Sequence, residues 1–137
     1  MAHSEKKALV DQALCTERCS CGGSHAIPDI LAYTGKDAFQ MLATDANRFL
    51  ADKKALVLDD ENTHRAAGTA VTDALKTAAV DHRVITLPGD SHLTDRLAAE
   101  VERQVAGCPL IIAVGSGTVN DLGKYTAHQL GIPYWCA

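Results

Sequence analysis

The stretch that decides the fold of this chain is Cys108-Pro-Leu-Ile-Ile-Ala-Val-Gly-Ser-Gly-Thr-Val-Asn-Asp-Leu-Gly-Lys-Tyr125. Its unbroken apolar run, Leu110–Val114, predicts a strand buried on both faces, as in a parallel sheet that helices cover on each side. Gly115 and Gly117 then permit a sharp turn of the backbone. The following segment, Thr118–Leu130, carries apolar residues at roughly helical spacing and predicts a helix.

This order of strand, glycine turn and helix has two explanations. Free backbone N–H groups from Gly115 to Thr118, together with the positive end of the helix dipole, would favour a bound phosphate. A tight strand-to-helix connection that binds no ligand would give the same pattern. The third glycine of the Gly-x-Gly-x-x-Gly fingerprint is missing, and a lone Gly-x-Gly is a weak signal. These residues alone therefore leave both explanations open.

Composition and charge describe a soluble globular domain. The chain has 137 residues, of which 47% are apolar and 22% charged, enough for one domain but short for a two-domain oxidoreductase. A net charge of -4 and scattered basic residues argue against a nucleic-acid partner. No apolar run approaches the ~20 residues that span a bilayer, and the start lacks the apolar region of a secretory signal. We therefore expect a cytoplasmic protein.

The N-terminal part contains a cluster of sulfur and imidazole side chains after a short amphipathic helix expected over Ser4–Leu14. Without an export signal, thiols or metal ligands are expected in place of disulfides. These side chains could hold a zinc ion, although their spacing matches no known zinc finger, and a reduced, turn-rich hairpin is favoured. The members of the cluster are Cys15, Cys19, Cys21 and His25.

The rest of the chain alternates predicted strands with predicted helices. The expected strands are Ile27–Tyr33, Lys54–Leu58, His82–Leu87 and Leu110–Val114, with one more beginning after Gly131. The expected helices are Lys36–Leu50, Thr63–Ala79, Leu93–Val105, capped by Ser91 or Thr94, and Thr118–Leu130. Such alternation produces a parallel sheet with right-handed crossovers. We therefore predict an α/β fold, a Rossmann-like three-layer domain with helices on both faces of the sheet.

An acidic segment, Asp59–Asn62, directly follows the strand expected over Lys54–Leu58. Open α/β sheets bind ligands at the carboxyl ends of their strands, where a carboxylate can accept hydrogen bonds from ribose hydroxyls. A cap on the following helix explains these residues equally well, and the two roles can coexist. His64 and Arg65 are expected on the solvated face of that helix.

Three motifs resemble the sn-glycerol-1-phosphate dehydrogenases. The segment Gly115–Tyr125, followed by Gly131-Ile-Pro-Tyr134, is the most specific of them. Asp60-Glu-Asn-Thr63 after a buried strand is the second, and Cys19-Ser-Cys-Gly22 ahead of Ile27-Pro28 is the third. The resemblance covers nearly the whole chain and extends to the superfamily of glycerol dehydrogenases, iron-containing alcohol dehydrogenases and dehydroquinate synthases.

The resemblance implies an N-terminal dinucleotide-binding domain over residues 27–137, preceded by the helix and cysteine-rich hairpin of residues 1–26. By analogy, Asp60 would hold the adenine-side ribose of NAD or NADP, with NAD expected over NADP. Asp121 would lie near the nicotinamide and the substrate hydroxyls, and Lys124 would support Asp121 or the phosphates. The residues that would cradle the pyrophosphate are Gly115, Ser116, Gly117, Thr118 and Val119.

Full-length relatives continue into a helical domain that binds a catalytic zinc, nickel or iron, and no such domain is expected within these residues. With it they interconvert glycerol 1-phosphate and dihydroxyacetone phosphate by metal-assisted hydride transfer, a reaction of phospholipid metabolism. The resemblance therefore implies the cofactor half of an oxidoreductase, inactive by itself, whose exposed apolar surface favours a homo-oligomer. The alternative is a self-standing nucleotide-binding or interaction module without catalysis, with a structural zinc at the cysteine cluster as one variant.

Overall fold

A computed structural model of the chain describes residues 31–137, with the exception of Ser116. The chain divides into two compact units, Met1–Thr34 and Gly35–Ala137. Residues 31–34, the described part of the first unit, contain neither helix nor strand. The helix expected over Ser4–Leu14 and the cysteine cluster lie outside the described residues, so the sheet and helices below all belong to the second unit.

Four parallel strands form the sheet of this unit, in the order β2-β1-β3-β4. They are β1 (Ala55–Asp60), β2 (His82–Leu87), β3 (Ile111–Ala113) and β4 (Tyr134–Cys136). Val57 of β1 lies opposite Val84 of β2 on one side and Ile112 of β3 on the other. The two central strands, β1 and β3, are the two that the sequence shows as continuous apolar runs.

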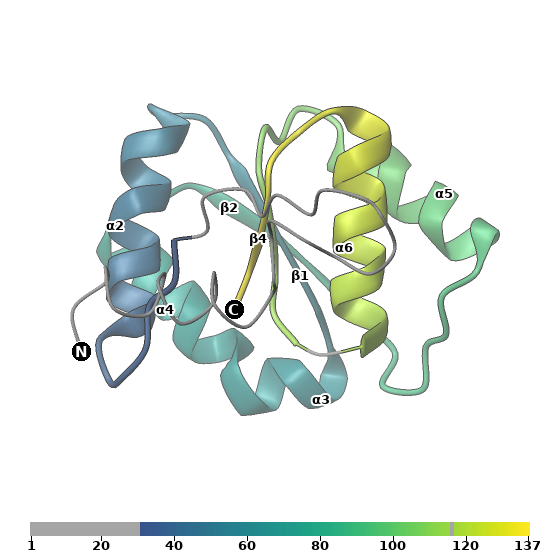
Figure 1. Ribbon diagram of the computed structural model, residues 1–137, viewed down its shortest axis with the longest axis horizontal. Helices are drawn as coiled ribbons and strands as arrows, with labels where there is room; N and C mark the ends of the chain where they lie inside the picture. The colour runs from purple at the N-terminus through teal and green to yellow at the C-terminus, as the bar shows by residue number, and fades with distance from the viewer. Residues whose placement is uncertain (1–30, 116) are drawn as a thin grey trace, which may run out of the picture. The chain divides into compact units, whose positions relative to one another are not determined.

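Helices cover both faces of this sheet. They are α2 (Ala38–Leu50), α3 (Glu61–Thr63), the π-helix η1 (His64–Gly68), α4 (Thr69–Thr77), α5 (Asp95–Val105) and α6 (Gly117–Leu130). Figure 1 shows α2 and α4 on one side of the sheet and α5 and α6 on the other. Of the two caps predicted for α5, Ser91 and Thr94, Thr94 is the one present, and it accepts the N–H of Leu97 at 3.2 Å. Among the described helices, none has the length and apolar character needed to cross a membrane.

Two apolar cores, one on each face, hold the three layers together. Successive residues of a strand point to opposite faces. Ala55 and Val57 therefore pack in the core under α2 and α4, whereas Leu56 and Leu58 pack in the core under α5 and α6. All four side chains are fully buried. The predicted α/β fold with helices on both faces is confirmed, and double-sided burial explains why β1 lacks an alternating polar pattern.

Some predicted boundaries differ from the structure. The strand expected over Ile27–Tyr33 is wrong in its described part, Leu31–Tyr33, which is irregular, because a short apolar run does not by itself determine a strand. The strand expected to end at Leu58 continues to Asp60. Both aspartates therefore belong to β1, and the helical segment that follows begins at Glu61.

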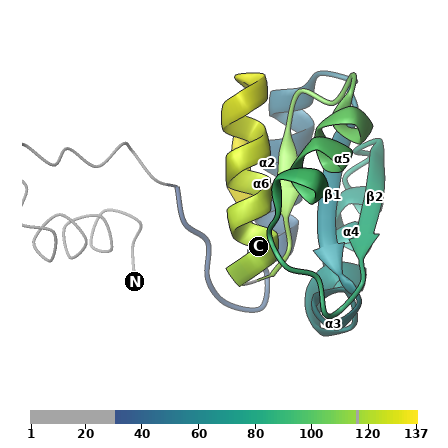
Figure 2. The ribbon, with the colours of Figure 1, turned by 90° about the vertical axis from the view of Figure 1, so that its right-hand side faces the viewer.

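The carboxyl ends of β1 and β3 lie next to each other where the chain connections diverge. These two strands are paired, yet α4 and α6, to which they lead, cover opposite faces of the sheet. In open parallel sheets, this divergence leaves a crevice in which ligands bind. Figure 2 shows α3 and the end of the chain, which follows β4, at this same end of the sheet. The fold thus identifies the residues after β1 and β3 as the candidate site.

Candidate functional site

The glycine turn between β3 and α6 packs against the segment that follows β1. Gly115 has a φ of +146° and Gly117 a φ of +39°, backbone conformations that favour glycine. A Cβ atom on Gly115 would lie only 2.8 Å from Cγ2 of Thr63. A Cβ atom on Gly117 would meet nothing within 4 Å. The turn is therefore tightly packed against Thr63 of α3 at Gly115, and it is open at Gly117, where α6 begins.

The N–H groups of the turn fall into two sets. Those of Val114 and Gly115 donate to the carbonyl oxygens of Leu58 at 2.8 Å and Ala137 at 3.1 Å, so they belong to the sheet. Those at the start of α6, Gly117–Val119, have no carbonyl acceptor within the helix. The expectation of a free N–H group at Gly115 is wrong, because the pairing of β3 with β4 extends to this residue. Gly115 instead contributes a backbone that approaches its neighbours closely.

The remaining residues of the expected phosphate cradle differ in exposure. Val119 is buried and packs in the core under α5 and α6, so only its backbone N–H can serve a ligand. Thr118 is half-buried in the first turn of α6. Ser116 lies outside the described residues. The cradle that the structure describes is therefore made of backbone groups at the start of α6.

Asp60, the last residue of β1, caps the helical segment that follows. Its Oδ1 atom accepts the N–H groups of Asn62 and Thr63, each at 2.8 Å. The Thr63 hydroxyl in turn accepts the N–H of Asp60 at 3.0 Å, which completes a capping box. The Oδ2 atom makes no hydrogen bond to any described residue. Of the two roles that the sequence left open, the cap is present, and the second oxygen stays free for a ligand.

The cap makes a stability prediction for Asp60. Asp60→Ala is expected to lower the free energy of unfolding by about 1 kcal/mol, because two N–H groups lose their acceptor. Asp60→Asn retains an acceptor oxygen, and asparagine caps helices about as well, so a change of only a few tenths of a kcal/mol is expected. Urea denaturation of both variants measures the difference. Equal losses in the two variants would contradict the capping role.

Asp59, the first residue of the acidic segment, is a buried carboxylate next to this cap, and its burial was not expected from the sequence. Asp59 is fully buried, and its Oδ2 atom lies 2.6 Å from Nδ1 of His64. Its Oδ1 atom is buried and has no hydrogen-bond partner among the described residues. The expectation that His64 lies on the solvated face holds only in part, because its side chain is 37% exposed but its Nδ1 atom contacts the buried Asp59. The available signal was the position of Asp59 within a strand whose two faces are both covered.

Side chains of α3 also hold the loop after β2. Oε2 of Glu61 accepts the N–H of Gly89 at 3.2 Å, and Nδ2 of Asn62 donates to the carbonyl oxygen of Gly89, also at 3.2 Å. Arg65 donates from its guanidinium to Oδ1 of Asn62 at 2.7 Å. The ends of β1, β2 and β3 thus form one continuous surface. We name it the carboxyl rim, and it comprises Asp60–Arg65, Gly89, Gly115 and Gly117–Asn120.

Polar side chains on α6 continue this surface. The Nζ atom of Lys124 lies 3.1 Å from Oδ1 of Asp121, and both side chains are exposed. The Tyr134 hydroxyl donates to Oδ1 of Asn120 at 2.8 Å and ties the start of α6 to β4. Burial, and secondarily Cys136 beside it, raises the pKa of Tyr134 well above its ordinary range. The phenol therefore keeps its proton and remains a hydrogen-bond donor.

The described residues offer no ligand set for a metal. Within residues 31–137, apart from Ser116, no three His, Cys, Asp or Glu side chains come together in a way that could hold a metal ion. The catalytic metal that the resemblance implies does not fit this part of the chain. The zinc ligands suggested by the sequence, which lie outside the described residues, are Cys15, Cys19, Cys21 and His25.

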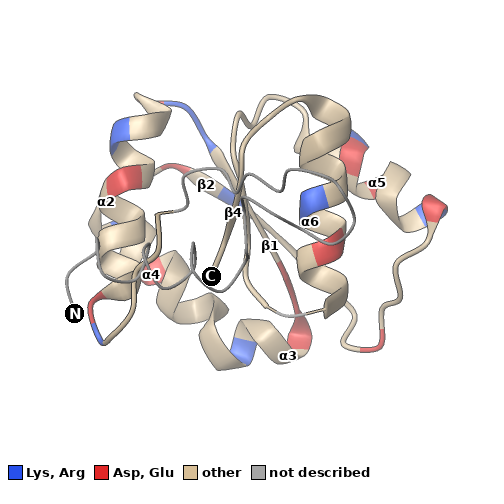
Figure 3. Cartoon of the chain, in the orientation of Figure 1, with Lys and Arg blue, Asp and Glu red and all other residues tan. Residues whose placement is uncertain are grey.

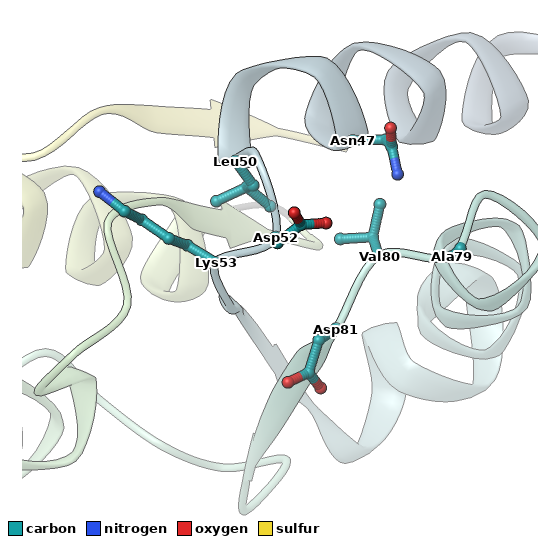
Figure 4. Close-up of a pocket in the computed structure, with 7 residues that line it drawn as sticks. All are labelled: Asn47, Leu50, Asp52, Lys53, Ala79, Val80 and Asp81. Atoms are coloured by element: carbon teal, nitrogen blue, oxygen red, sulfur yellow. The ribbon is translucent and has the colours of Figure 1, made fainter.

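A pocket of about 120 Å³ lies at the amino ends of β1 and β2. Figure 4 shows the side chains around it, which come from the end of α2 and from the segments that lead into the two strands. They include Asn47, Asp52, Lys53 and Asp81. Because parallel strands place their amino and carboxyl ends at opposite edges of a sheet, this pocket is separate from the carboxyl rim.

The iron-containing alcohol dehydrogenases match residues 34–136 of this chain, a range that includes the whole sheet and the carboxyl rim. The chain belongs to this family. Several curated relatives are named glycerol-1-phosphate dehydrogenase (NAD(P)+), among them two from Geobacillus species. The one from Geobacillus stearothermophilus is 26% identical over 123 residues, which cover 85% of this chain and 30% of the relative. The one from Geobacillus thermodenitrificans strain NG80-2 is 31% identical over 104 residues, which cover 72% of this chain and 25% of the relative.

Solved structures support the fold of this iron-containing alcohol dehydrogenase family member. Glycerol dehydrogenase from Schizosaccharomyces pombe superposes with a TM-score of 0.55 at 22% identity, over 69% of this chain and 24% of that one. A structure from Ralstonia eutropha JMP134, assigned as an alcohol dehydrogenase, superposes with a TM-score of 0.65 at 24% identity. The match covers 82% of this chain and 30% of that one. The chain thus spans less than a third of the length of these relatives.

Proposed function

We propose that this chain binds NAD or NADP at the carboxyl rim and supplies the cofactor half of a polyol-phosphate dehydrogenase. The observation that supports this most directly is the contact between Gly115 and Thr63. It brings the glycine turn, with the free N–H groups of α6, next to Asp60, which has a free carboxylate oxygen. A dinucleotide needs both features, since its pyrophosphate and its ribose lie a few ångströms apart.

In this proposal the pyrophosphate lies at the start of α6. The N–H groups of Gly117–Val119 donate to the phosphate oxygens, and the positive end of the α6 dipole adds to the attraction. Open space beside Gly117 lets the phosphate approach the backbone. Thr118 adds a hydroxyl from the same turn. Gly115 keeps the path to the rim free of side-chain atoms.

Asp60 is proposed to hold the adenine-side ribose through Oδ2 while Oδ1 keeps its capping bonds. A carboxylate accepts hydrogen bonds from both ribose hydroxyls and repels a 2′-phosphate, so NAD is favoured over NADP. We propose Asp121, whose carboxylate contacts Lys124, for the nicotinamide and substrate side. The roles divide along the rim, with the ribose at the end of β1 and the reacting end along α6.

The proposed substrates are glycerol 1-phosphate and dihydroxyacetone phosphate. When bound, the nicotinamide supplies hydride exchange with a secondary alcohol or ketone. Since the described residues contain no metal site, residues outside them would provide the ligands for the metal of this family. We therefore expect the isolated 137-residue chain to bind cofactor without measurable turnover, and we propose that the whole protein is a cytoplasmic homo-oligomer.

A second candidate is a self-standing nucleotide-binding module without catalysis. The observation that favours it is that Gly35–Ala137 forms a compact unit containing both apolar cores. The two candidates differ in ligand preference. A cofactor half binds NAD more tightly than ATP, because it uses both halves of the dinucleotide, whereas a general nucleotide module binds ATP at least as well.

Calorimetric titration of the purified chain with NAD, and separately with ATP, tests the proposal. We expect saturable NAD binding, and about tenfold weaker binding in Asp60→Asn, because this variant keeps the cap but loses a charge-assisted hydrogen bond. Circular dichroism checks that the variant is folded. No NAD binding at millimolar concentration, or unchanged affinity in Asp60→Asn, would contradict the assignment.

A further inference from the structure

We propose that Arg65 provides the subsite for the 2′-phosphate of NADP, so that Asp60 and Arg65 together set the choice between NAD and NADP. This inference rests on the proposed function, since it requires the adenine-side ribose to lie at Asp60. It concerns a residue for which the sequence predicts only a place on the solvated face of a helix. Arg65 is indeed exposed, and its position on the carboxyl rim gives it a specific neighbourhood.

Arg65 is linked to Asp60 through a single intervening residue. The guanidinium donates to Oδ1 of Asn62 at 2.7 Å, and the backbone N–H of Asn62 donates to Oδ1 of Asp60 at 2.8 Å. Asn62 is itself fixed, because its Nδ2 atom donates to the carbonyl oxygen of Gly89. The guanidinium is therefore held by the same residue whose backbone contacts the proposed ribose-binding carboxylate, and we infer that it reaches a group on the 2′ oxygen.

The charge of Arg65 is also available to a ligand. Among the described residues, five other basic side chains each contact a carboxylate: Arg48, Lys54, Lys76, Arg103 and Lys124. Arg65 contacts only the neutral amide oxygen of Asn62 within the described part of the chain. That bond engages one of the five N–H donors of a guanidinium. The planar group can thus still bind a phosphate through two parallel hydrogen bonds.

Two carboxylates on the rim limit the effect of this one positive charge. Asp60 and Glu61 lie five and four residues before Arg65, and Figure 3 shows acidic and basic segments near each other along this part of the chain. Oε2 of Glu61 is engaged by the N–H of Gly89. Arg65 therefore offsets the repulsion that Asp60 exerts on a 2′-phosphate without reversing the preference for NAD. The chain accepts both cofactors and binds NAD more tightly.

Calorimetric titrations of the full chain and of Arg65→Ala with NAD and with NADP test this subsite. We expect Arg65→Ala to weaken NADP binding about tenfold or more and to change NAD binding less than twofold, because only NADP loses a charge-assisted contact. Arg65→Gln can still donate a hydrogen bond to Asn62 but carries no charge, so we expect the same selective loss of affinity for NADP. This second variant provides the test if Arg65→Ala folds poorly. Titration with 2′,5′-ADP against 5′-ADP isolates the 2′-phosphate from the nicotinamide half.

Arg83→Ala is the matched control. Arg83 is also exposed, but it lies near the amino end of β2, so its loss should leave both affinities unchanged. Two outcomes would overturn the inference while the proposed function stands, provided that the unchanged chain binds NAD. In one, the Arg65 variants lose affinity for NAD and for NADP equally, and in the other, they lose no affinity for NADP. NADP failing to bind a chain that binds NAD would do the same. Failure of both dinucleotides to bind would remove the proposed function, and the subsite with it.

Discussion

Gly68→Ala is expected to lower the free energy of unfolding by about 3 kcal/mol or more. A Cβ atom at this position would lie 2.5 Å from Oδ2 of Asp59 and 2.8 Å from Nδ1 of His64. The added methyl group must therefore separate the two side chains or move η1 away from β1. Either movement weakens the contact that His64 makes with a fully buried carboxylate. Urea or thermal unfolding of the variant measures the loss.

Backbone propensity alone predicts the opposite sign for this substitution, which makes the test sharp. Gly68 has helical dihedral angles, with φ at -56° and ψ at -44°. In an unobstructed helix, replacing glycine by alanine stabilises by about 1 kcal/mol. A variant more stable than the natural chain would therefore show that Asp59 and His64 are not packed against Gly68. Ala66→Gly, at an exposed site in the same π-helix, measures how much an exchange between alanine and glycine changes the free energy of unfolding through helix propensity alone.

Gly115→Ala is expected to weaken NAD binding at least tenfold and to lower the free energy of unfolding by about 1–3 kcal/mol. The substitution adds strain at a φ of +146° and forces the new methyl group to within 2.8 Å of Cγ2 of Thr63. Displacing Thr63 would also disturb the cap at Asp60, so both proposed ends of the cofactor site are affected. Calorimetric titration with NAD and urea unfolding measure the two effects.

Two further variants separate strain from the steric contact at Gly115. Gly117→Ala also faces a positive φ, of +39°, but its Cβ atom enters open space, so we expect the milder loss of stability. Thr63→Ser removes Cγ2 and keeps the hydroxyl of the capping box. Combining Thr63→Ser with Gly115→Ala should therefore recover part of the lost affinity. No recovery in this double variant would indicate that the contact with Thr63 is not what the alanine disturbs.

The layered fold could be predicted because both faces of its central strands are covered. Leu56 and Leu58 pack against one helix layer, and Val57 packs against the other, so the sequence must be apolar at every position of the strand. The capping residue Thr94 was predictable for a similar reason, since its action depends on residues only a few positions away. Local patterns of this kind are visible in the sequence itself.

Contacts that depend on register or on an unusual turn could not be predicted. Asp59 lies in β1 and His64 begins the π-helix, so their contact depends on how the chain bends between the strand and the helical segment that follows. The N–H of Gly115 is occupied because β4 pairs far enough along β3 for Ala137 to accept it. Neither the bend after β1 nor the length of the pairing between β3 and β4 appears as a pattern of residue types.

The link between α3 and the loop after β2 has the same origin. Asn62 and Gly89 are 27 positions apart, and they meet because Asp60 lies opposite Leu87 in the register of β1 with β2. For Asp60 itself, the sequence shows that an acid ends the strand but not how its two oxygens are used. The structure shows that one oxygen serves the cap, and this leaves the other for a ligand.

The central claim is that the carboxyl rim binds the dinucleotide, and NMR titration of the ¹⁵N-labelled chain with NAD tests it most directly. The amide signals of Gly117–Asn120, and those of Asn62 and Thr63, should shift together along one saturable curve. The signals of Ala79–Asp81 at the opposite edge of the sheet should stay in place. Saturable shifts confined to Ala79–Asp81, or no shifts on the carboxyl rim at saturating NAD, would contradict the account.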